Sequence, residues 1–246
     1  FLSAGTTTGR MASESPNLQN IPNRSDLGLR IRNAFRAEKG NVLVSFDYSQ
    51  IELRIAAFLS GDKELIRIFK EGKDVHTAVA AAVFGVPIAQ VDKEMRRRAK
   101  VINFGVMYGM GVNALQKNLI VPRTNSPEAN LNGQAGEAPI ARADAQKFYD
   151  DYFKTFSGLA EYLDNVKKET ARRGYTETVF GRRRYFEGIN SRLPFIRAAA
   201  ERMAINAPIQ GTEADIIKLA MVEIDNWLTR QNFASPSQIS TEISAG

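Results

Sequence analysis

Residues 96 to 108 read Arg96-Arg97-Arg98-Ala99-Lys100-Val101-Ile102-Asn103-Phe104-Gly105-Val106-Met107-Tyr108. Cations and then aromatic residues recur in this run at intervals of four, at Arg96, Lys100, Phe104 and Tyr108. Four residues turn an α-helix by about 400°, so successive side chains drift by only about 40° and share one broad face. At about 1.5 Å per residue, Arg96 to Phe104 spans about 12 Å, roughly the reach from the γ-phosphate of a nucleoside triphosphate to its base.

The order of side chains along this face also matches a nucleotide. Arginine and lysine pair with phosphate oxygens, whereas aromatic rings stack on a base or a sugar. Phe104 and Tyr108 taken alone would more often be core residues of an amphipathic helix. A face buried in a core should not continue as Arg96 and Lys100 for two turns, however. The run therefore predicts a helix that binds a nucleoside triphosphate, in a chain that acts on nucleic acid.

The composition fits such a chain and excludes several other kinds of site. The 246 residues, 43% of them hydrophobic, suffice for one large domain or two small ones. Basic residues number 33 against 27 acidic ones, and the clusters at 96–100 and 182–184 point to a polyanionic partner. Solvated helix faces are the alternative reading of either cluster alone. The absence of cysteine excludes disulfides, thiolate metal sites and cysteine nucleophiles, and one histidine excludes sites that need several.

No apolar run approaches the roughly 20 residues of a membrane span, so no membrane partner is expected. The chain begins with Phe1 rather than methionine, and we expect an internal fragment. The patterns predict a predominantly helical α+β fold. We expect an irregular segment at 5–24, a buried strand at 41–47, helices at 49–60, 63–108 (with breaks at 72 and 85–87), 143–153 and 159–173, a hairpin at 175–186, and two helices at 194–206 and 212–229.

Asp47 stands where the predicted strand gives way to a helix. A carboxylate at a strand end suits Mg²⁺, which prefers hard oxygen ligands, and the carbonyl of Tyr48 offers a second oxygen. The sequence Ser49-Gln-Ile-Glu52 also fits a capping box, with Ser49 at the N-cap and Glu52 three residues into the helix. On spacing alone, capping is the better interpretation of Glu52. The two roles are compatible, because a Glu fixed by its own helix terminus is also a stiff wall beside a ligand.

At this point a family resemblance is visible. Residues 96–109 closely resemble the fingers helix of family A DNA polymerases, the bacterial DNA polymerase I type. Asp-Tyr-Ser-Gln-Ile-Glu-Leu-Arg at 47–54 resembles the first catalytic motif of that family. Further family blocks resemble residues 8–10 with 16–22, 180–185 and 201–211. These runs follow the family's order and cover the chain from about residue 6 to 228, as a fragment of palm and fingers.

The resemblance implies roles for residues that their spacing alone does not assign. Asp47, Arg96 and Lys100 would be catalytic, and Asp47 and Tyr48 would hold metal. Glu52 would be the steric gate that excludes a ribose 2′-hydroxyl. His76 by itself would be an unremarkable surface residue. The nucleotide site would comprise Gln50, Glu52, His76, Arg96, Lys100, Phe104 and Tyr108, and the DNA contacts would come from Arg10, Asn17, Gln19, Asn20, Arg202, Asn206 and Gln210.

The resemblance also implies the reaction, the partners and a division of the chain. A primer 3′-oxygen would attack the α-phosphorus of a dNTP, assisted by two Mg²⁺ ions, on a DNA primer-template. The protein would be a cytoplasmic monomer. We expect part of the palm at 1–60, fingers at 61–190 with a flexible insertion near 121–142, palm helices at 191–232, and a divergent tail at 233–246.

The chain departs from the family in one respect. The second catalytic motif, His-Asp-Glu on a hairpin, is absent, and two closely spaced metal ions need more than one carboxylate. We therefore expect this chain alone not to polymerise. A nucleic-acid-binding homologue without catalysis is the alternative from another class. A single-subunit RNA polymerase is a third possibility, against which Glu52 argues, because such an enzyme must admit the 2′-hydroxyl.

Overall fold

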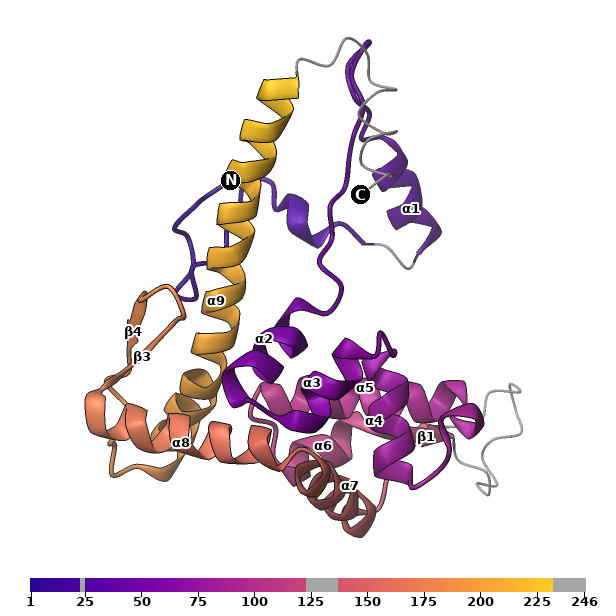
Figure 1. The fold of residues 1–246 in the computed structure, drawn as a ribbon, viewed down its shortest axis with the longest axis vertical. Coiled ribbons are helices and arrows are strands. Elements are labelled where there is room, and N and C mark those ends of the chain that lie inside the picture. The colour runs from indigo at the N-terminus through magenta and orange to yellow at the C-terminus, as the bar shows by residue number, and fades with distance from the viewer. Residues whose placement is uncertain (23–24, 123–136, 232–246) are drawn as a thin grey trace. The chain divides into compact units, whose positions relative to one another are not determined.

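The computed structural model describes residues 1–22, 25–122 and 137–231 (Figure 1). The chain forms two compact units, one made of residues 1–49 with 210–246 and the other of residues 50–209. Most described residues are helical and the two sheets have two strands each, which confirms the predominantly helical α+β fold. The assignment of residue ranges to palm and fingers stays a prediction.

The unit of residues 50–209 is a cluster of helices. Helix α4 packs against α5 and α7, α6 packs against α7, and α2 packs against α8. Fully buried side chains such as Leu65, Ile102, Tyr152 and Phe156 fill the space between them. The helices are α2 (Ile51–Ser60), α3 (Lys63–Lys70), α4 (Val75–Phe84), α5 (Lys93–Met107), α6 (Val112–Asn118), α7 (Arg142–Thr155), α8 (Ser157–Arg173) and the first part of α9 (Pro194–Gln231), with a 3-10 turn η2 at Ile88–Gln90.

Side-chain caps and glycines mark the ends of several helices. Asp62, Asp74 and Asp92 are the N-caps of α3, α4 and α5, and each accepts hydrogen bonds from backbone N–H groups of its first turn. Gly61 and Gly85 end α2 and α4 in the left-handed conformation that glycine adopts without a steric cost. The predicted breaks at 72 and 85–87 are therefore confirmed.

Both sheets are short antiparallel hairpins. Strands β3 (Tyr175–Glu177) and β4 (Arg183–Tyr185) confirm the predicted hairpin, and the Tyr175 and Tyr185 rings pack with centroids 5.4 Å apart. Strands β1 (Ile120–Pro122) and β2 (Glu137–Pro139) pair at the two ends of the predicted insertion. Most of that insertion, like the predicted tail at 233–246, lies outside the described residues.

Helix α9 corrects the prediction of two separate helices. It runs unbroken from Pro194 to Gln231, with Pro208 and Gly211 inside it. A proline removes one backbone hydrogen bond and bends a helix without having to end it, and here both flanking stretches are strongly helical in pattern. The break predicted from the proline and the glycine is therefore wrong.

The other unit is more open. It contains η1 (Leu18–Asn20), α1 (Asp26–Asn33), which the patterns did not predict, and the second part of α9. The predicted strand at 41–47 is wrong, because residues 41–48 carry no strand. Its apolar side chains are exposed, among them Val42, Leu43 and Phe46. A strand needs a neighbour for its backbone hydrogen bonds, and no described segment pairs with this one.

A single buried carboxylate, that of Asp62, joins two helices of the larger unit. Its Oδ1 accepts from the backbone N–H groups of Glu64 (3.1 Å) and Leu65 (3.0 Å) at the start of α3. Its Oδ2 accepts from the N–H of Leu159 at the start of α8, at 3.1 Å. A Cβ at Gly158 would lie 3.0 Å from the Asp62 Cα, so the close approach needs glycine. One side chain therefore binds the first turns of two helices, and its partner Leu159 lies 97 residues further along the chain.

We predict that Asp62→Ala lowers the free energy of unfolding by about 2–4 kcal/mol, because it removes a cap and leaves buried N–H groups without a partner. Asp92→Ala is the matched control, since Asp92 is exposed and caps α5 alone through Met95. That variant should lose about 1 kcal/mol. Urea denaturation followed by circular dichroism measures both, and equal losses would contradict the bridging role of Asp62.

Candidate nucleotide site on helix α5

Helix α5 is placed so that one face packs inward and the other is open. Ala99, Ile102 and Val106 are buried, whereas Arg96 and Lys100 are exposed. The helix starts at the Asp92 cap and ends at Tyr108, after which Gly109 takes a positive φ of 68°. The predicted helix and its shared outer face are thus confirmed as geometry. The nucleotide itself stays a prediction.

Three rings lie in a row along this face. Phe104 and Tyr108 are nearly parallel, with an interplanar angle of 16° and centroids 6.4 Å apart. The ring of His76, from α4, lies 5.7 Å from that of Phe104. Flat rings in this arrangement, with cations one and two turns earlier, offer stacking at one end and charge at the other.

Arg96 is held in place by a carboxylate. Its Nε and one terminal nitrogen donate to the two oxygens of Asp74 at 2.9 and 3.0 Å, in the bidentate geometry that suits a guanidinium. Asp74 also accepts from the N–H of Thr77 at the start of α4. Burial opposes ionisation of this carboxyl, but the hydrogen bonds from Arg96 and Thr77 outweigh it and lower the pKa of Asp74 to about 2. Lys100, in contrast, has no ion-pair partner among the described residues.

Glu52 contacts Tyr108, the last of the three rings. Its side chain is only 7% exposed, and its two oxygens accept from the hydroxyl of Tyr108 at 2.8 and 3.1 Å. The predicted capping box is wrong. Gln50, not Ser49, is the N-cap of α2, and its left-handed φ of 56° prevents the extended geometry that such a box needs. Glu52 is thus bound by the Tyr108 hydroxyl, 56 residues further along the chain.

His76 is not the surface residue that its sequence context predicted. It is 4% exposed, and its Nδ1 lies 3.0 Å from Nδ2 of the fully buried Asn103. Burial lowers the pKa of His76, Asp74 opposes that effect, and Arg96 and Lys100 reinforce it. The sequence reasoning missed Asp74 and Asn103. Two features of the sequence could have indicated them. Asp74 is a potential N-cap two residues before the histidine, and Asn103 is a polar residue on the apolar side of α5.

The remaining predicted site residues fall in different places. Gln50 begins α2, and Arg202 and Asn206 lie on the part of α9 that belongs to the larger unit. Arg10, Asn17, Gln19, Asn20, Asp47, Tyr48 and Gln210 all belong to the other unit. The structure therefore brings the predicted nucleotide residues together in one unit, whereas the predicted DNA contacts are divided between the two.

Within the smaller unit, several of these side chains already have partners. Arg10 forms an ion pair with Glu213 of α9, with its Nε 3.1 Å from the carboxylate. Asn17 accepts from the N–H of Gln19 and so caps η1. Gln19 donates to the carbonyl of Met11 at 3.3 Å. These contacts leave the predicted DNA role untested.

The described residues do not form a two-metal centre by themselves. No group of three or more acidic or histidine side chains that could hold a metal occurs in the described ranges. Asp47 and Tyr48 are exposed and offer one carboxylate and one carbonyl. Two cations a few ångströms apart need more negative charge than that. The two-metal mechanism stays a prediction.

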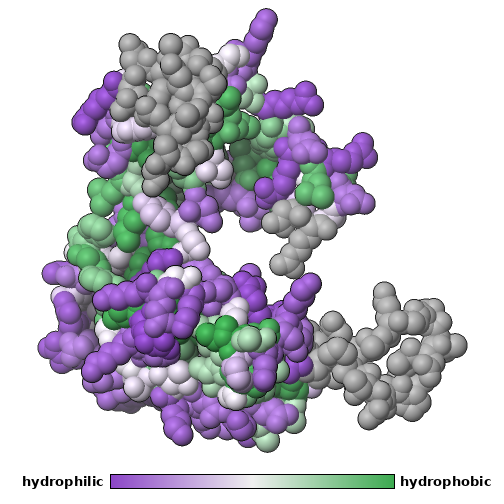
Figure 2. Space-filling view, turned by 45° about the vertical axis from the view of Figure 1, so that its right-hand side comes forward, coloured by the Kyte–Doolittle hydropathy of each residue, from purple (hydrophilic) through white to green (hydrophobic). Residues whose placement is uncertain are grey.

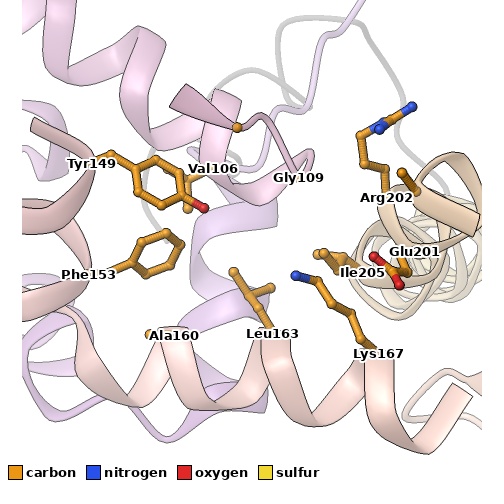
Figure 3. Close-up of a pocket in the computed structure, with 12 residues that line it drawn as sticks. Val106, Gly109, Tyr149, Phe153, Ala160, Leu163, Lys167, Glu201, Arg202 and Ile205 are labelled. Atoms are coloured by element: carbon orange, nitrogen blue, oxygen red, sulfur yellow. The ribbon is translucent and has the colours of Figure 1, made fainter. Parts of the chain in front are cut away.

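A cavity of about 380 Å³ lies beside the C-terminal end of α5 (Figure 3). Tyr149 and Phe153 of α7 form one wall, and Lys167 of α8 and Glu201 of α9 turn their charged ends toward the opening. Gly109 is part of the rim, where an added Cβ would lie 3.0 Å from Cγ of Arg202. The turn after α5 thus rests directly on α9. Figure 2 shows one face of the molecule, on which the helices of the larger unit, in the lower part, are mostly hydrophilic with small hydrophobic patches.

Known DNA polymerases are similar to this chain in sequence. The chain belongs to the DNA polymerase A family, whose model, described as "DNA polymerase family A", matches residues 1–243. It is 49% identical over 224 residues to the thermostable DNA polymerase I of Thermus aquaticus, covering 91% of this chain and 25% of that protein. It is 46% identical over 225 residues to DNA polymerase I of Pseudomonas aeruginosa, covering 92% of this chain and 23% of that protein.

A solved structure shares the fold as well. The chain superposes with a TM-score of 0.80 and 40% identity on the POL domain of Pol1 from M. smegmatis, a complex with DNA primer-template and dNTP. The match covers 95% of this chain and 38% of that one. The chain thus spans about a quarter of the curated relatives that it matches. No helix among the described residues is long and apolar enough to cross a membrane.

We predict that Arg96→Gln is less stable than wild type by about 0.5–1 kcal/mol at neutral pH, because Asp74 loses its ion pair. A lowered carboxyl pKa stabilises the fold above the ordinary value of 3.8, and that contribution is lost as the pH falls toward 2. The stability difference should therefore be constant from pH 7 to 5 and shrink below pH 4. Urea titrations at each pH measure it.

Lys100→Gln is the matched control, because it removes a cation of the same helix face that has no ion-pair partner in the described ranges. Its stability relative to wild type should not narrow in the same pH window. A constant difference for Arg96→Gln down to pH 2 would show that the pair with Asp74 does not lower the pKa of that carboxyl.

Proposed function

We propose that this chain is the nucleotide-binding part of a DNA-directed DNA polymerase that transfers a nucleotide from a dNTP to a primer 3′-hydroxyl. The observation that carries the proposal is the row of His76, Phe104 and Tyr108 beside Arg96 and Lys100, all in one compact unit. Membership in the DNA polymerase A family and the likeness to a polymerase solved with primer-template and dNTP support it.

In the proposed reaction the primer 3′-oxygen attacks the α-phosphorus in line, and pyrophosphate leaves. Arg96 and Lys100 bind the β- and γ-phosphate oxygens and offset the charge that develops on the leaving group. Arg96 is pre-oriented by Asp74, so less of its side-chain freedom is lost when the phosphate binds. Phe104 packs against the base or sugar, and Tyr108 lies at the end where the template base would meet it.

Divalent metal, which we expect to be Mg²⁺, supplies charge stabilisation at the reacting phosphate in this chemistry. Asp47 and the carbonyl of Tyr48 would be two of its ligands, and a two-metal site would need further carboxylates. The chain as given should therefore bind nucleotide and DNA without extending a primer. Arg10, Asn17, Gln19, Asn20, Arg202, Asn206 and Gln210 are the proposed DNA contacts. The protein as a cytoplasmic monomer also stays a proposal.

The first test uses a chimera in which the 224 matched residues replace their counterparts in the Thermus aquaticus polymerase. We predict that the chimera extends a primer and that this chain alone binds primer-template but does not extend it. In the chimera, Asp47→Ala should reduce extension to background and leave primer-template affinity largely intact, because the carboxylate binds metal rather than DNA. Primer-extension gels and fluorescence anisotropy measure the two properties.

Glu38→Ala is the matched control, since Glu38 is an exposed acid of the same unit with no proposed role. It should leave both properties unchanged. Equal loss of extension and DNA binding in Asp47→Ala would refute the metal role. A chimera that binds DNA but never extends it would favour a nucleic-acid-binding homologue without catalysis.

A second prediction concerns sugar selectivity. Glu52 is buried against Tyr108, so its carboxylate is a rigid wall where the sugar of a stacked nucleotide would lie. In the chimera, Glu52→Ala should raise ribonucleotide incorporation relative to deoxyribonucleotide by about 10- to 100-fold, the range that one lost contact in a fitted pocket supports. Ratios of kcat/KM for a matched dNTP and rNTP measure the change.

Tyr108→Phe tests whether the hydrogen bond from Tyr108 holds the Glu52 carboxylate in place. It keeps the ring and removes only the hydroxyl that donates to Glu52. It should relax sugar selectivity by less than Glu52→Ala does. Unchanged selectivity in Glu52→Ala would reduce the role of this carboxylate to the packing of Tyr108 against α2.

A further inference from the structure

His76 and Asn103 form a buried polar pair near Arg96 and Lys100, the two cations proposed to bind phosphate. Nδ1 of the ring faces Nδ2 of the amide at 3.0 Å, and the two residues are 4% and 0% exposed. In this orientation the Asn103 Oδ1 has no hydrogen-bond partner. The opposite orientation would turn the NH₂ group away from Nδ1, so the contact with His76 would no longer bond it, and unpaired buried N–H groups are the rarer and costlier case.

This contact determines which nitrogen of the ring carries the proton. An amide NH₂ donates and cannot accept, so it requires a lone pair on Nδ1. A neutral imidazole with a lone pair on Nδ1 has its hydrogen on Nε2. A protonated ring would set two donors against each other across 3.0 Å. The geometry therefore favours the neutral ring in its Nε2–H form.

The other nitrogen of the ring is open. Among the described residues, the buried side-chain atoms without a hydrogen-bond partner are Gln50 Oε1, Asn103 Oδ1 and Tyr152 Oη. His76 Nε2 is not among them, and the hydrogen bond recorded for the ring is the one at Nδ1. Nε2 consequently keeps access to solvent. The charged groups around the ring are Asp74 on α4 and Arg96 and Lys100 on α5.

We propose that Asn103 is a positioning residue that holds His76 as the Nε2–H tautomer, so that the ring donates a hydrogen bond to a phosphate oxygen of the bound dNTP. The identity of the ligand rests on the proposed function, whereas the tautomer does not. The reverse tautomer would turn a lone pair toward the phosphate and repel it. An uncharged donor beside Arg96 and Lys100 adds direction to a site where those two side chains supply the charge.

Burial supports the neutral ring. The pKa of His76 is lowered by desolvation, with Arg96 and Lys100 acting in the same direction and Asp74 against them. The ring should therefore stay neutral near pH 7, where nucleotide binding is measured. Bound phosphate would itself favour the protonated ring, and the Asn103 amide opposes that protonation because it occupies Nδ1 as a donor.

The experiment uses the full 246-residue chain without a histidine tag, because His76 is its single histidine and every imidazole signal then belongs to it. Two-bond ¹H–¹⁵N spectra of the nucleotide-free protein distinguish the two tautomers by the nitrogen shifts. We expect a protonated Nε2 and an unprotonated Nδ1 at pH 7. The Nδ1–H form or an even mixture would overturn the proposal, whether or not any variant folds.

Asn103→Asp is the matching variant, because a carboxylate of the same shape accepts a hydrogen bond and should draw the proton to Nδ1. The expected result is a switch to the Nδ1–H tautomer, with dATP affinity by calorimetry about 10-fold weaker, the effect of one lost hydrogen bond to a charged group. Asn165→Asp, an exposed change of the same kind on α8, should alter neither property.

The possible results test the positioning role of Asn103 and the proposed nucleotide binding separately. A switched tautomer with unchanged dATP affinity would overturn the positioning role and leave the proposed function intact. A wild-type chain that shows the Nε2–H form but binds no dATP would overturn the proposed function and the phosphate contact with it. Weaker binding in Asn165→Asp, equal to that in Asn103→Asp, would attribute the loss to added negative charge and also overturn the role of Asn103.

Discussion

Asp62 accepts backbone hydrogen bonds from the first turns of two helices, α3 and α8, and it does so while almost fully buried. The first N–H groups of a helix have no partner within the helix, so a buried helix terminus needs an acceptor from elsewhere. This carboxylate serves two such termini at once. Helix α8 in turn packs on α2, and α3 contacts both α2 and α4. Asp62 thus links α3 and α8, two of the helices that support the site.

The site depends on this framework because its parts come from different helices. Helix α4 contributes His76 and the Asp74 cap, α5 contributes the cations and Phe104, and α2 contributes Glu52. Three of these side chains are each held by a residue elsewhere in the chain. Arg96 is bound by Asp74, His76 by Asn103, and Glu52 by Tyr108. Such cross-bracing fixes the side chains before any ligand arrives, which lowers the entropic cost of binding.

The sequence predicted the helical elements better than it predicted the contacts between them. The four-residue recurrence from Arg96 to Tyr108, the glycine breaks and the hairpin at 175–186 are local patterns, and the structure has them. The strand at 41–47 and the break near Pro208 failed, because each depends on what lies beside the segment rather than within it. The prediction that His76 lies on the surface was wrong for the same reason. No local pattern shows that Asn103, 27 residues away, faces its ring.

The turn at Gly109 has a consequence for how the two predicted binding surfaces respond to each other. Its backbone lies so close to Arg202 that an added Cβ would come within 3.0 Å of the Arg202 Cγ and 3.3 Å of its Cα. A shift of the C-terminal end of α5 must therefore be taken up by the side chain or backbone of Arg202, and the reverse holds equally. By thermodynamic linkage, if such a shift changes the affinity of a ligand at Arg202, that ligand changes the affinity for the nucleotide by the same factor. If Arg202 contacts DNA as proposed, Gly109 is a place in this unit where nucleotide and DNA binding would affect each other.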